Sequence, residues 1–215
     1  CIKAGIKDII FVISKKKEII KKYFYNDTFY KKITKKKKDL RIIKEYKKIL
    51  FYKKRIKFVY QNKPLGTGDA VLKAMKYIKD DYFLMLLPDD LIIKKNCSKE
   101  MIFIHNKYKS SVMASMKVSR KTVNRWGILS SSRNLDYKNF LIKKVVEKPK
   151  IINAPSNNAV IGRYILPKKI FKLLKYQSKG KGDEIHITDS IQKLINSGHK
   201  FIGHKFSGKY LDCGT

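Results

Sequence analysis

The sequence of 215 residues lacks several features that mark common classes of protein. It contains no run of about 18 apolar residues, so we expect no membrane-spanning helix and no membrane partner. Its cysteines, Cys1, Cys97 and Cys213, are far apart in the sequence and form no CxxC pair. This spacing argues against a zinc site and favours the reducing cytoplasm. No linker rich in glycine, proline or serine divides the chain and no segment repeats, so we expect one domain over residues 1–215.

Arginine is also scarce, with 6 residues against 45 lysines in a chain of formal net charge +34. Such a charge attracts nucleic acids, but the recognition of bases and phosphates relies on the planar fork of arginine. The lysines are spread through almost every segment, and Lys, Ile, Asn and Tyr all have A/T-rich codons. The composition therefore indicates drift in an A/T-biased genome. We expect no specific nucleic-acid partner, although a weak, salt-sensitive affinity for polyanions follows from the charge.

The common phosphate-binding loops are missing as well. Residues 61–75, QNKPLGTGDAVLKAM, place a proline and two glycines between a strand-like IKFVY and a helix-like DAVLKAMKYI. A Walker loop would need lysine and a hydroxyl residue where Asp69 and Ala70 stand, and a dinucleotide-binding loop would need glycine at Val71. Taken alone, the stretch is equally compatible with a tight strand-to-helix connection that binds nothing.

Strand-like apolar runs alternate with helical patterns in the first half of the chain. Strands are predicted at 6–14, 56–60 and 82–88, and helices at 15–24, in the lysine-rich stretch up to about residue 54, and at 69–78. The second half has strand-like segments at 111–118, 126–132, 141–149 and 159–167 with fewer helices between them. Apolar strands alternating with helices are typical of a parallel sheet covered on both faces. We therefore predict an α/β fold with a Rossmann-like, mixed but mainly parallel sheet flanked by helices.

Charged side chains directly follow several predicted strands, where ligands bind in open parallel sheets. LMLLPDD places Asp89 and Asp90 after an apolar strand, and KYLDCGT ends similarly with Asp212. Two carboxylates at one edge suit a hard cation such as Mg²⁺, although each aspartate alone is also an ordinary turn residue. VVEKP adds Glu147 and Lys148. A lysine there suits a phosphate, and the neighbouring carboxylate suits sugar hydroxyls.

Together these motifs resemble the bacterial UTP–glucose-1-phosphate uridylyltransferases, a branch of the sugar-phosphate nucleotidyltransferases. The matching motifs cover nearly the whole chain in the family's order: QNKPLGTGDAV, LLPDD, WGI, VVEKP, SNNAVIGRYIL, GDEIHITDSI and LDCGT. SNNAVIGRYIL followed by GDEIHITDSI is specific to the glucose enzymes. The resemblance implies a glycosyltransferase-A-like nucleotidyltransferase fold and a cytoplasmic homo-oligomer. It also implies uridylyl transfer from UTP to glucose 1-phosphate, giving UDP-glucose and pyrophosphate.

The resemblance assigns roles to individual residues. Gln61 and the backbone at Gly66 would face uracil, because a carboxamide matches the carbonyl and N3–H of this base and glycine lets a backbone N–H approach it. Asp89 and Asp212 would coordinate Mg²⁺, and Lys148 would hold the sugar phosphate. Glucose would contact Glu147 and the backbone at Gly127 and Gly162. Thymine presents the same edge as uracil, so Gln61 does not separate UTP from dTTP and a thymidylyltransferase remains an alternative.

Two substitutions and one missing loop depart from the family pattern. Trp126 replaces a usual tyrosine and Asp69 a usual histidine, departures that leave the expected reaction class intact and bear only on fine sugar or base preference. The family's N-terminal strand and G-x-G-T-R loop, which cradles the triphosphate, has no counterpart in the sequence. We therefore expect a chain truncated at the N-terminus, and at the C-terminus too, that is inactive by itself. A decayed, non-catalytic remnant and a basic nucleic-acid-binding protein are the other hypotheses.

Overall fold

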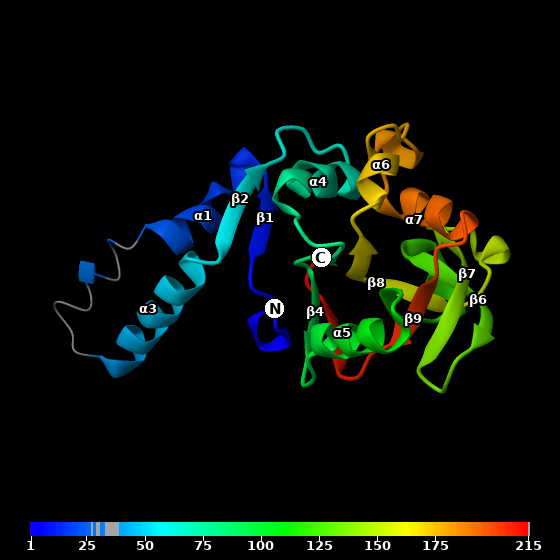
Figure 1. Ribbon diagram of the computed structural model, residues 1–215, viewed down its shortest axis with the longest axis horizontal. Helices are drawn as coiled ribbons and strands as arrows, with labels where there is room; N and C mark the ends of the chain where they lie inside the picture. Colours follow the sequence, from blue (N-terminus) through cyan, green and yellow to red (C-terminus); the bar gives the residue numbers. More distant parts are fainter. Residues whose placement is uncertain (27, 29–30, 33–38, 215) are drawn as a thin grey trace.

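Residues 1–26, 28, 31–32 and 39–214 are described by the computed structural model, which is an α/β protein (Figure 1). At one end, strand β1 (Ile9–Ile13) pairs in parallel with β2 (Ile56–Tyr60). Helices α1 (Glu18–Tyr25) and α3 (Leu40–Lys53) lie beside this pair. Phe24 of α1 packs against Phe11 and Phe58, with ring centroids 5.7 and 6.3 Å apart. These aromatic side chains join the helix to the two strands.

A six-stranded sheet forms the other end of the molecule. Its strands, in spatial order, are β3 (Tyr82–Leu86), β8 (Asn158–Pro167), β5 (Ser111–Lys117), β9 (Phe201–Lys205), β7 (Asn139–Glu147) and β6 (Gly127–Asn134). The strands predicted at 82–88, 111–118, 126–132, 141–149 and 159–167 are all present, with their ends shifted by a few residues. Strand β9 was not predicted.

The sheet is mixed, as predicted, but the prediction that it is mainly parallel was wrong. Among the described pairings, β1–β2 and β5–β9 are parallel, whereas the other pairs are antiparallel: β3–β8, β5–β8, β6–β7, β6–β8, β7–β9 and β4–β10. Strands β5 and β8 are buried along most of their length. A strand covered on both faces is apolar at nearly every position, whichever way its neighbours run. An apolar run therefore indicates burial and not strand direction.

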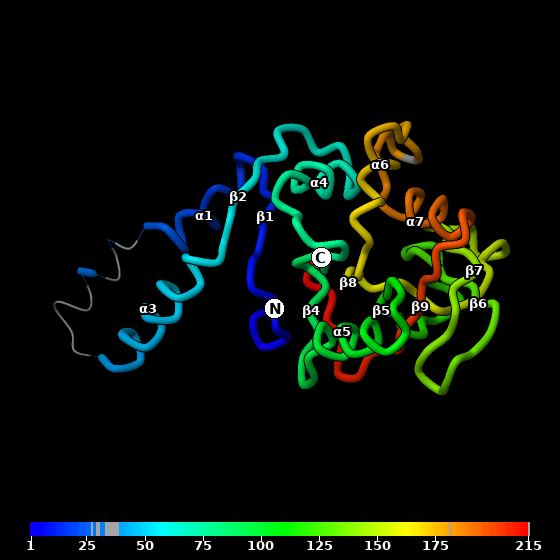
Figure 2. Tube along the Cα trace, viewed as in Figure 1, coloured from blue at the N-terminus to red at the C-terminus, as the bar shows by residue number. Residues whose placement is uncertain are grey.

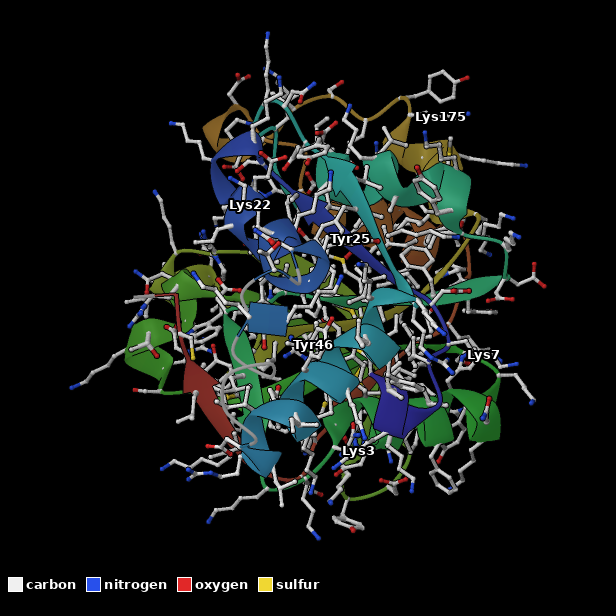
Figure 3. The ribbon with its side chains drawn as sticks, turned by 90° about the vertical axis from the view of Figure 1, so that its left-hand side faces the viewer. Lys3, Lys7, Lys22, Tyr25, Tyr46 and Lys175 are labelled. Carbon is white, nitrogen blue, oxygen red and sulfur yellow. The ribbon has the colours of Figure 1, made fainter. Side chains whose placement is uncertain are left out.

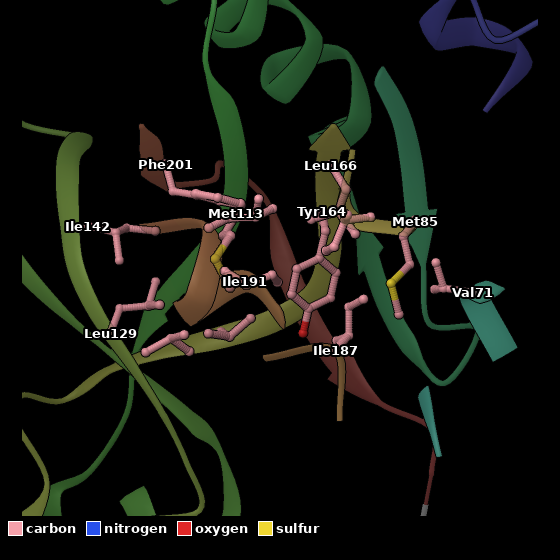
Figure 4. Packing of buried hydrophobic residues seen from close by; sticks show 14 of the residues in the cluster. Val71, Met85, Met113, Leu129, Ile142, Tyr164, Leu166, Ile187, Ile191 and Phe201 are labelled. Atoms are coloured by element: carbon pink, nitrogen blue, oxygen red, sulfur yellow. The ribbon is translucent and has the colours of Figure 1, made fainter. Parts of the chain in front are cut away.

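Helices cover both faces of the six-stranded sheet. On one face, α4 (Thr67–Ala74), α6 (Ile170–Leu174) and α7 (Ile187–Asn196) enclose the main hydrophobic core, with Met113 and Ile191 near its centre (Figure 4). On the other face, α5 (Cys97–Tyr108) packs over Val112 and Ala114. Met113 therefore faces one core while its neighbours face the other, as the alternation of side chains along a strand requires. None of the described helices is both long and apolar enough to cross a lipid bilayer.

A short antiparallel ribbon ties the end of the described chain to the segment after β3. Strand β10 (Lys209–Asp212) pairs with β4 (Asp90–Ile93), and Asp212 lies opposite Asp90. The last described residues therefore lie beside β4, near the middle of the molecule (Figure 2). This ribbon brings Asp89 close to Asp212, which we had expected to result from two parallel strands ending at one edge.

Candidate active site

The loop after β2 carries the first predicted site residues. Gln61 directly follows β2, and its backbone N–H donates to the carbonyl of Ile13 at 2.9 Å. The β1–β2 pair thus fixes the backbone of Gln61. Helix α4 begins at Thr67, directly after Gly66, whose φ of 99° lies in the region that favours glycine. The helix predicted at 69–78 therefore begins on the glycine turn itself.

The carboxamide of Gln61 is held from inside the protein. Its Nε2 donates to Asp69 Oδ2 at 2.9 Å and to the carbonyl of Gly66 at 3.1 Å. Asp69 is buried, and its Oδ1 lies 3.3 Å from Lys73 Nζ. Gln61 Oε1 has no partner among the residues that the structure describes. The side chain therefore offers a ligand an acceptor, where the sequence had led us to expect a donor and an acceptor.

Residues 184–188 close over this loop from a distant part of the sequence. The N–H of Ile185 donates to the carbonyl of Leu65 at 2.8 Å, and its own carbonyl accepts from the N–H of Gly68 at 2.7 Å. A Cβ atom at Gly66 or at Gly68 would lie 2.8 Å from the Ile185 carbonyl oxygen. Both glycines are therefore required for the close approach of the two segments. The motif GDEIHITDSI packs directly on the motif LGTGDAV.

The same segment reaches the residues predicted to bind glucose. Thr188 Oγ1 donates to Glu147 Oε2 at 3.2 Å. Glu147 is the last residue of β7 and pairs with Gly127, the first residue of β6. A Cβ atom at Gly127 would lie 3.2 Å from Glu147 Oε2, so the backbone and the carboxylate are close together. Thr188, which orients this carboxylate, was not identified from the sequence.

Lys148 lies directly after β7 in an uncommon backbone conformation. Its φ is 40°, in the left-handed region, and its N–H donates to the carbonyl of Trp126 at 3.0 Å. The exposed side chain lines an open pocket of about 550 Å³ together with Asn124, Pro149, Lys150, Ile151 and Ile152. Strained backbone of this kind is concentrated at ligand-binding sites. The ammonium group is accessible to a ligand in this pocket.

The two predicted metal ligands lie side by side. The position of a Cβ atom at Gly214 is 3.1 Å from Asp89 Oδ2 and 3.3 Å from Asp212 Oδ1. Both carboxylates therefore border the same point beside Gly214. The N–H of Cys213 donates to the Asp89 carbonyl at 2.8 Å and fixes this arrangement. Arg125 Nη2 lies 3.9 Å from Asp212 Oδ2, whereas the Asp89 carboxylate has no partner in the described part of the chain.

Asp90, beside the predicted ligand Asp89, has a structural role that the sequence did not reveal. Its Oδ2 accepts from the N–H of Gly162 at 2.7 Å, and its Oδ1 accepts from the hydroxyl of Tyr210. Arg163 donates to the Asp90 carbonyl and, at 2.6 Å, to the Leu87 carbonyl. These bonds connect β8, residues 87–90 and β10. They hold the turn from which Asp89 projects.

Gly162 is not open to a ligand in this arrangement. Its N–H is bonded to Asp90, and its carbonyl accepts from Leu87 N at 2.7 Å and from Arg163 Nη1 at 2.9 Å. A Cβ atom there would overlap the Asp90 carboxylate and lie 2.5 Å from Leu87 Cβ. Close packing of the turn explains the glycine. Both polar groups of its backbone are bonded within the protein. The predicted contact between this backbone and glucose stays a prediction.

The carboxylates around the ribbon affect the ionisation of their neighbours. Burial raises the pKa of Tyr210, and so do its hydrogen bond to Asp90 and the charges of Asp212 and Asp89. Burial lowers the pKa of Arg163, an effect opposed mainly by the charge of Asp90. The Tyr210 hydroxyl therefore stays protonated and continues to donate to Asp90. Asp90 is thus held in place beside Asp89.

The donor set fits a divalent cation that binds together with a phosphate. No group of three or more His, Cys, Asp or Glu side chains in the described part of the chain could hold a metal by itself. Asp89 and Asp212 supply two hard oxygen donors. Mg²⁺ usually takes one or two carboxylates from a protein and fills its other positions with water and substrate phosphates.

Comparison with known proteins matches the whole chain, residues 1–215, to the family described as Nucleotidyl transferase. The chain is 32% identical over 214 residues to the UTP–glucose-1-phosphate uridylyltransferase of Bacillus subtilis (strain 168), covering 99% of this chain and 72% of that protein. It is 37% identical over 153 residues to the protein of the same name from Pseudomonas aeruginosa, covering 70% of this chain and 54% of the relative.

Solved structures show the same similarity. UDP-glucose pyrophosphorylase complexed with UDP-glucose has a TM-score of 0.84 and 31% identity, covering 100% of this chain and 78% of that one. The UTP-bound UGPase from Acinetobacter baumannii has a TM-score of 0.86 and 30% identity, covering 100% of this chain and 74% of that one. The α/β nucleotidyltransferase fold predicted from the motifs is the fold of these proteins.

Proposed function

The chain belongs to the nucleotidyl transferase family, and from that membership we propose that it transfers the uridylyl group of UTP to glucose 1-phosphate, giving UDP-glucose and pyrophosphate. One observation carries the proposal: the segment 184–188 bonds to both halves of the site. Ile185 bonds to Leu65, in the loop predicted to face the base. Thr188 bonds to Glu147, one of the residues predicted to contact the sugar. The motif GDEIHITDSI, which resembles the glucose enzymes, thus contacts both halves of the site. The relatives that cover nearly the whole chain carry the name of this activity.

Gln61 and Gly66 are proposed to bind the uracil ring. Gln61 Oε1 is a free acceptor, and the N–H of Gly66 has no acceptor among the described residues. A neighbouring acceptor and donor complement the N3–H and a carbonyl of uracil. Thymine carries the same two groups, so a thymidylyltransferase is the second candidate.

Lys148, Glu147 and Gly127 are proposed to bind glucose 1-phosphate. The ammonium group of Lys148 attracts the phosphate, and the carboxylate of Glu147, oriented by Thr188, accepts sugar hydroxyls. A phosphate oxygen of glucose 1-phosphate attacks the α-phosphorus of UTP in line. The new phosphorus–oxygen bond forms as the bond to the departing pyrophosphate breaks. The chain needs no covalent intermediate and no general base, since positioning and charge neutralisation dominate such transfers.

Nucleotidyl transferases of this family generally use a divalent metal, and we propose Mg²⁺ held by Asp89 and Asp212. A cation bound there would neutralise charge on the transferring phosphate and on the departing pyrophosphate. Both carboxylate oxygens of Asp90 accept hydrogen bonds, from Gly162 and Tyr210, so its neighbour Asp89 is the proposed metal ligand. Asp90 itself is a structural residue in this proposal.

A cytoplasmic location and a homo-oligomeric state are further parts of the proposal. Cys1, Cys97 and Cys213 are free thiols, which suits a reducing compartment. Phe103 and Ile152 expose 66% and 86% of their surface, and such apolar residues are suited to contacts between subunits. Light scattering during size-exclusion chromatography would give the assembly state.

Product formation with each nucleoside triphosphate tests the proposed function. The 215 residues contain no G-x-G-T-R sequence, so the assay uses a version extended by this loop before Cys1, with Mg²⁺ and glucose 1-phosphate. We expect UDP-glucose and pyrophosphate in equal amounts from UTP. Faster turnover with dTTP would favour the thymidylyltransferase, and equal or faster turnover with ATP would contradict the proposal. No product from any of these nucleotides would favour a non-catalytic remnant.

A further inference from the structure

The buried carboxylate of Asp69 lies behind the proposed uracil site and has no role in the activity described so far. We propose that Asp69 is a positioning residue, which fixes the Gln61 carboxamide with its oxygen outward and thereby selects a base that carries an N3–H. The inference rests on the proposed function, because it names what makes that site choose uracil. Its basis is the set of atoms around the Gln61 side chain.

These atoms determine which end of the carboxamide faces outward. The oxygen and nitrogen of a glutamine amide are distinguished by their hydrogen-bond partners. Gln61 Nε2 faces two acceptors, Asp69 Oδ2 at 2.9 Å and the Gly66 carbonyl at 3.1 Å. Turning the amide over would place Oε1 against two oxygens and leave a buried carboxylate oxygen without its donor. That loss makes the reversed orientation unfavourable.

Asp69 is itself held rigidly, so it can impose this orientation. Its side chain is only 6% exposed, whereas its ion-pair partner Lys73, 3.3 Å from Oδ1, is exposed, so burial and not this surface pair holds Asp69 in place. It lies in the first turn of the helix, where negative charge is favourable. The backbone of Gln61 is fixed independently by its bond to Ile13. Both partners are therefore immobile before a ligand arrives.

The consequence is a site that distinguishes uracil from cytosine. The N3 atom of uracil carries a hydrogen, which Gln61 Oε1 can accept, while the free N–H of Gly66 donates to a carbonyl. Cytosine in the same position presents an acceptor at N3, and its amino group would meet the N–H of Gly66. A freely rotating amide could turn over and serve cytosine through Nε2. Because Asp69 and Gly66 occupy Nε2, the site rejects cytosine by leaving polar groups unpaired.

The orientation can be measured without a nucleotide, by ¹⁵N NMR of the 215-residue chain. We expect the two Nε2 protons of Gln61, identified by their loss in Gln61→Ala, to give separate, slowly exchanging signals. In Asp69→Ala these signals should exchange rapidly with water. Lys73→Ala removes the ion pair but keeps Asp69, so its signals should match those of the wild type. Asp69→Asn retains an acceptor and the shape of the side chain, and should keep partial protection. Equal protection in wild type and Asp69→Ala would overturn the inference.

The effect on base selection is measured by calorimetric titration of UTP and CTP. The ratio of the two affinities should fall about tenfold in Asp69→Ala, the effect of one hydrogen bond, and should be unchanged in Lys73→Ala. An unchanged ratio in both Asp69→Ala and Asp69→Asn would contradict the role of Asp69. A wild-type chain that prefers CTP would contradict the proposed function instead. The NMR comparison would still report the contact between Asp69 and Gln61, so the two failures are distinguishable.

Discussion

Lys148 combines an exposed ammonium group with a backbone conformation that lysine rarely adopts. Its φ is 40°, and its N–H is tied to the carbonyl of Trp126. A non-glycine residue in the left-handed region costs roughly 1–2 kcal/mol. Glycine would adopt this backbone conformation with less strain. A need for positive charge beside Glu147 would explain why lysine occupies the position.

Lys148→Gly should therefore separate stability from ligand binding. We expect the free energy of unfolding to stay the same or to rise by up to about 1 kcal/mol, because the backbone strain is relieved. The affinity for glucose 1-phosphate should fall about 10- to 150-fold, because a charge-assisted contact contributes about 1.5–3 kcal/mol. Denaturant unfolding and calorimetric titration measure the two effects. Lys144→Ala, an exposed lysine of β7, is the control, and equal affinities in both variants would argue against the role of Lys148.

The sequence allowed some residues of the proposed site to be predicted and gave no sign of others. Gln61 and Lys148 directly follow strands and Glu147 ends one, and all three belong to short motifs, so their positions could be predicted. Thr188 and Asp90 could not, because their roles depend on Glu147 and on Gly162, whose contacts with them are long-range. The predictive value of a motif thus ended where contacts between distant segments began.

The β4–β10 ribbon is the element that assembles the proposed metal site. It places Asp212 opposite Asp90 in the antiparallel register, one residue from Asp89. The Tyr210 hydroxyl and the Cys213 N–H then bond across the ribbon to Asp90 and Asp89. Without this pairing, Asp89 and Asp212 would not lie side by side. The two carboxylates should consequently act as one unit.

Asp89→Asn and Asp212→Asn test this coupling. Each keeps the shape of the side chain and removes its charge, so we expect both variants to fold. In each, the gain in UDP-glucose affinity on adding Mg²⁺ should be lost, because the cation needs both carboxylates. The double variant should be little worse than either single one, since residues that act together are non-additive.

Titration calorimetry with and without Mg²⁺ gives these values, and Asp80→Asn, at an exposed position away from the ribbon, is the control. Losses in the two single variants that multiply in the double variant would show that the aspartates act separately.

At this scale the sequence predicted which segments form strands better than how the strands pair. The strand at 56–60 was predicted with the bounds that the structure has, because its apolar residues and flanking turn mark both ends. Strand β9 (201–205) and helix α5 (97–108) were missed. Helix α5 is only weakly amphipathic, so its sequence lacks a clear helical pattern of apolar residues. The predicted direction of most strand pairs was wrong, because the burial of a strand does not determine whether its neighbours run parallel or antiparallel.

The positive charge is distributed over many separate parts of the molecule. In the view towards α1 and α3, the labelled lysines Lys3, Lys7, Lys22 and Lys175 lie apart from one another (Figure 3). The proposed metal site is, by contrast, lined by carboxylates. These four lysines of the described chain therefore form no continuous stripe in this view.

Binding to nucleic acid should accordingly be weak and independent of sequence. We expect two unrelated DNA duplexes to bind with equal affinity, and binding to fall steeply between about 50 and 200 mM salt, as counterion release requires. Fluorescence anisotropy at several salt concentrations measures both properties. A preference for one duplex that persists at high salt would favour the nucleic-acid-binding hypothesis.

A crystal structure of the chain with UDP-glucose tests most directly whether the two halves of the site work together. The structure should place uracil N3 about 2.7–3.2 Å from Gln61 Oε1, the distance of a hydrogen bond. The glucose ring should lie against Glu147 and Gly127. Either group bound elsewhere, or a uracil ring that faces away from Gln61, would contradict the proposed uridylyltransferase site.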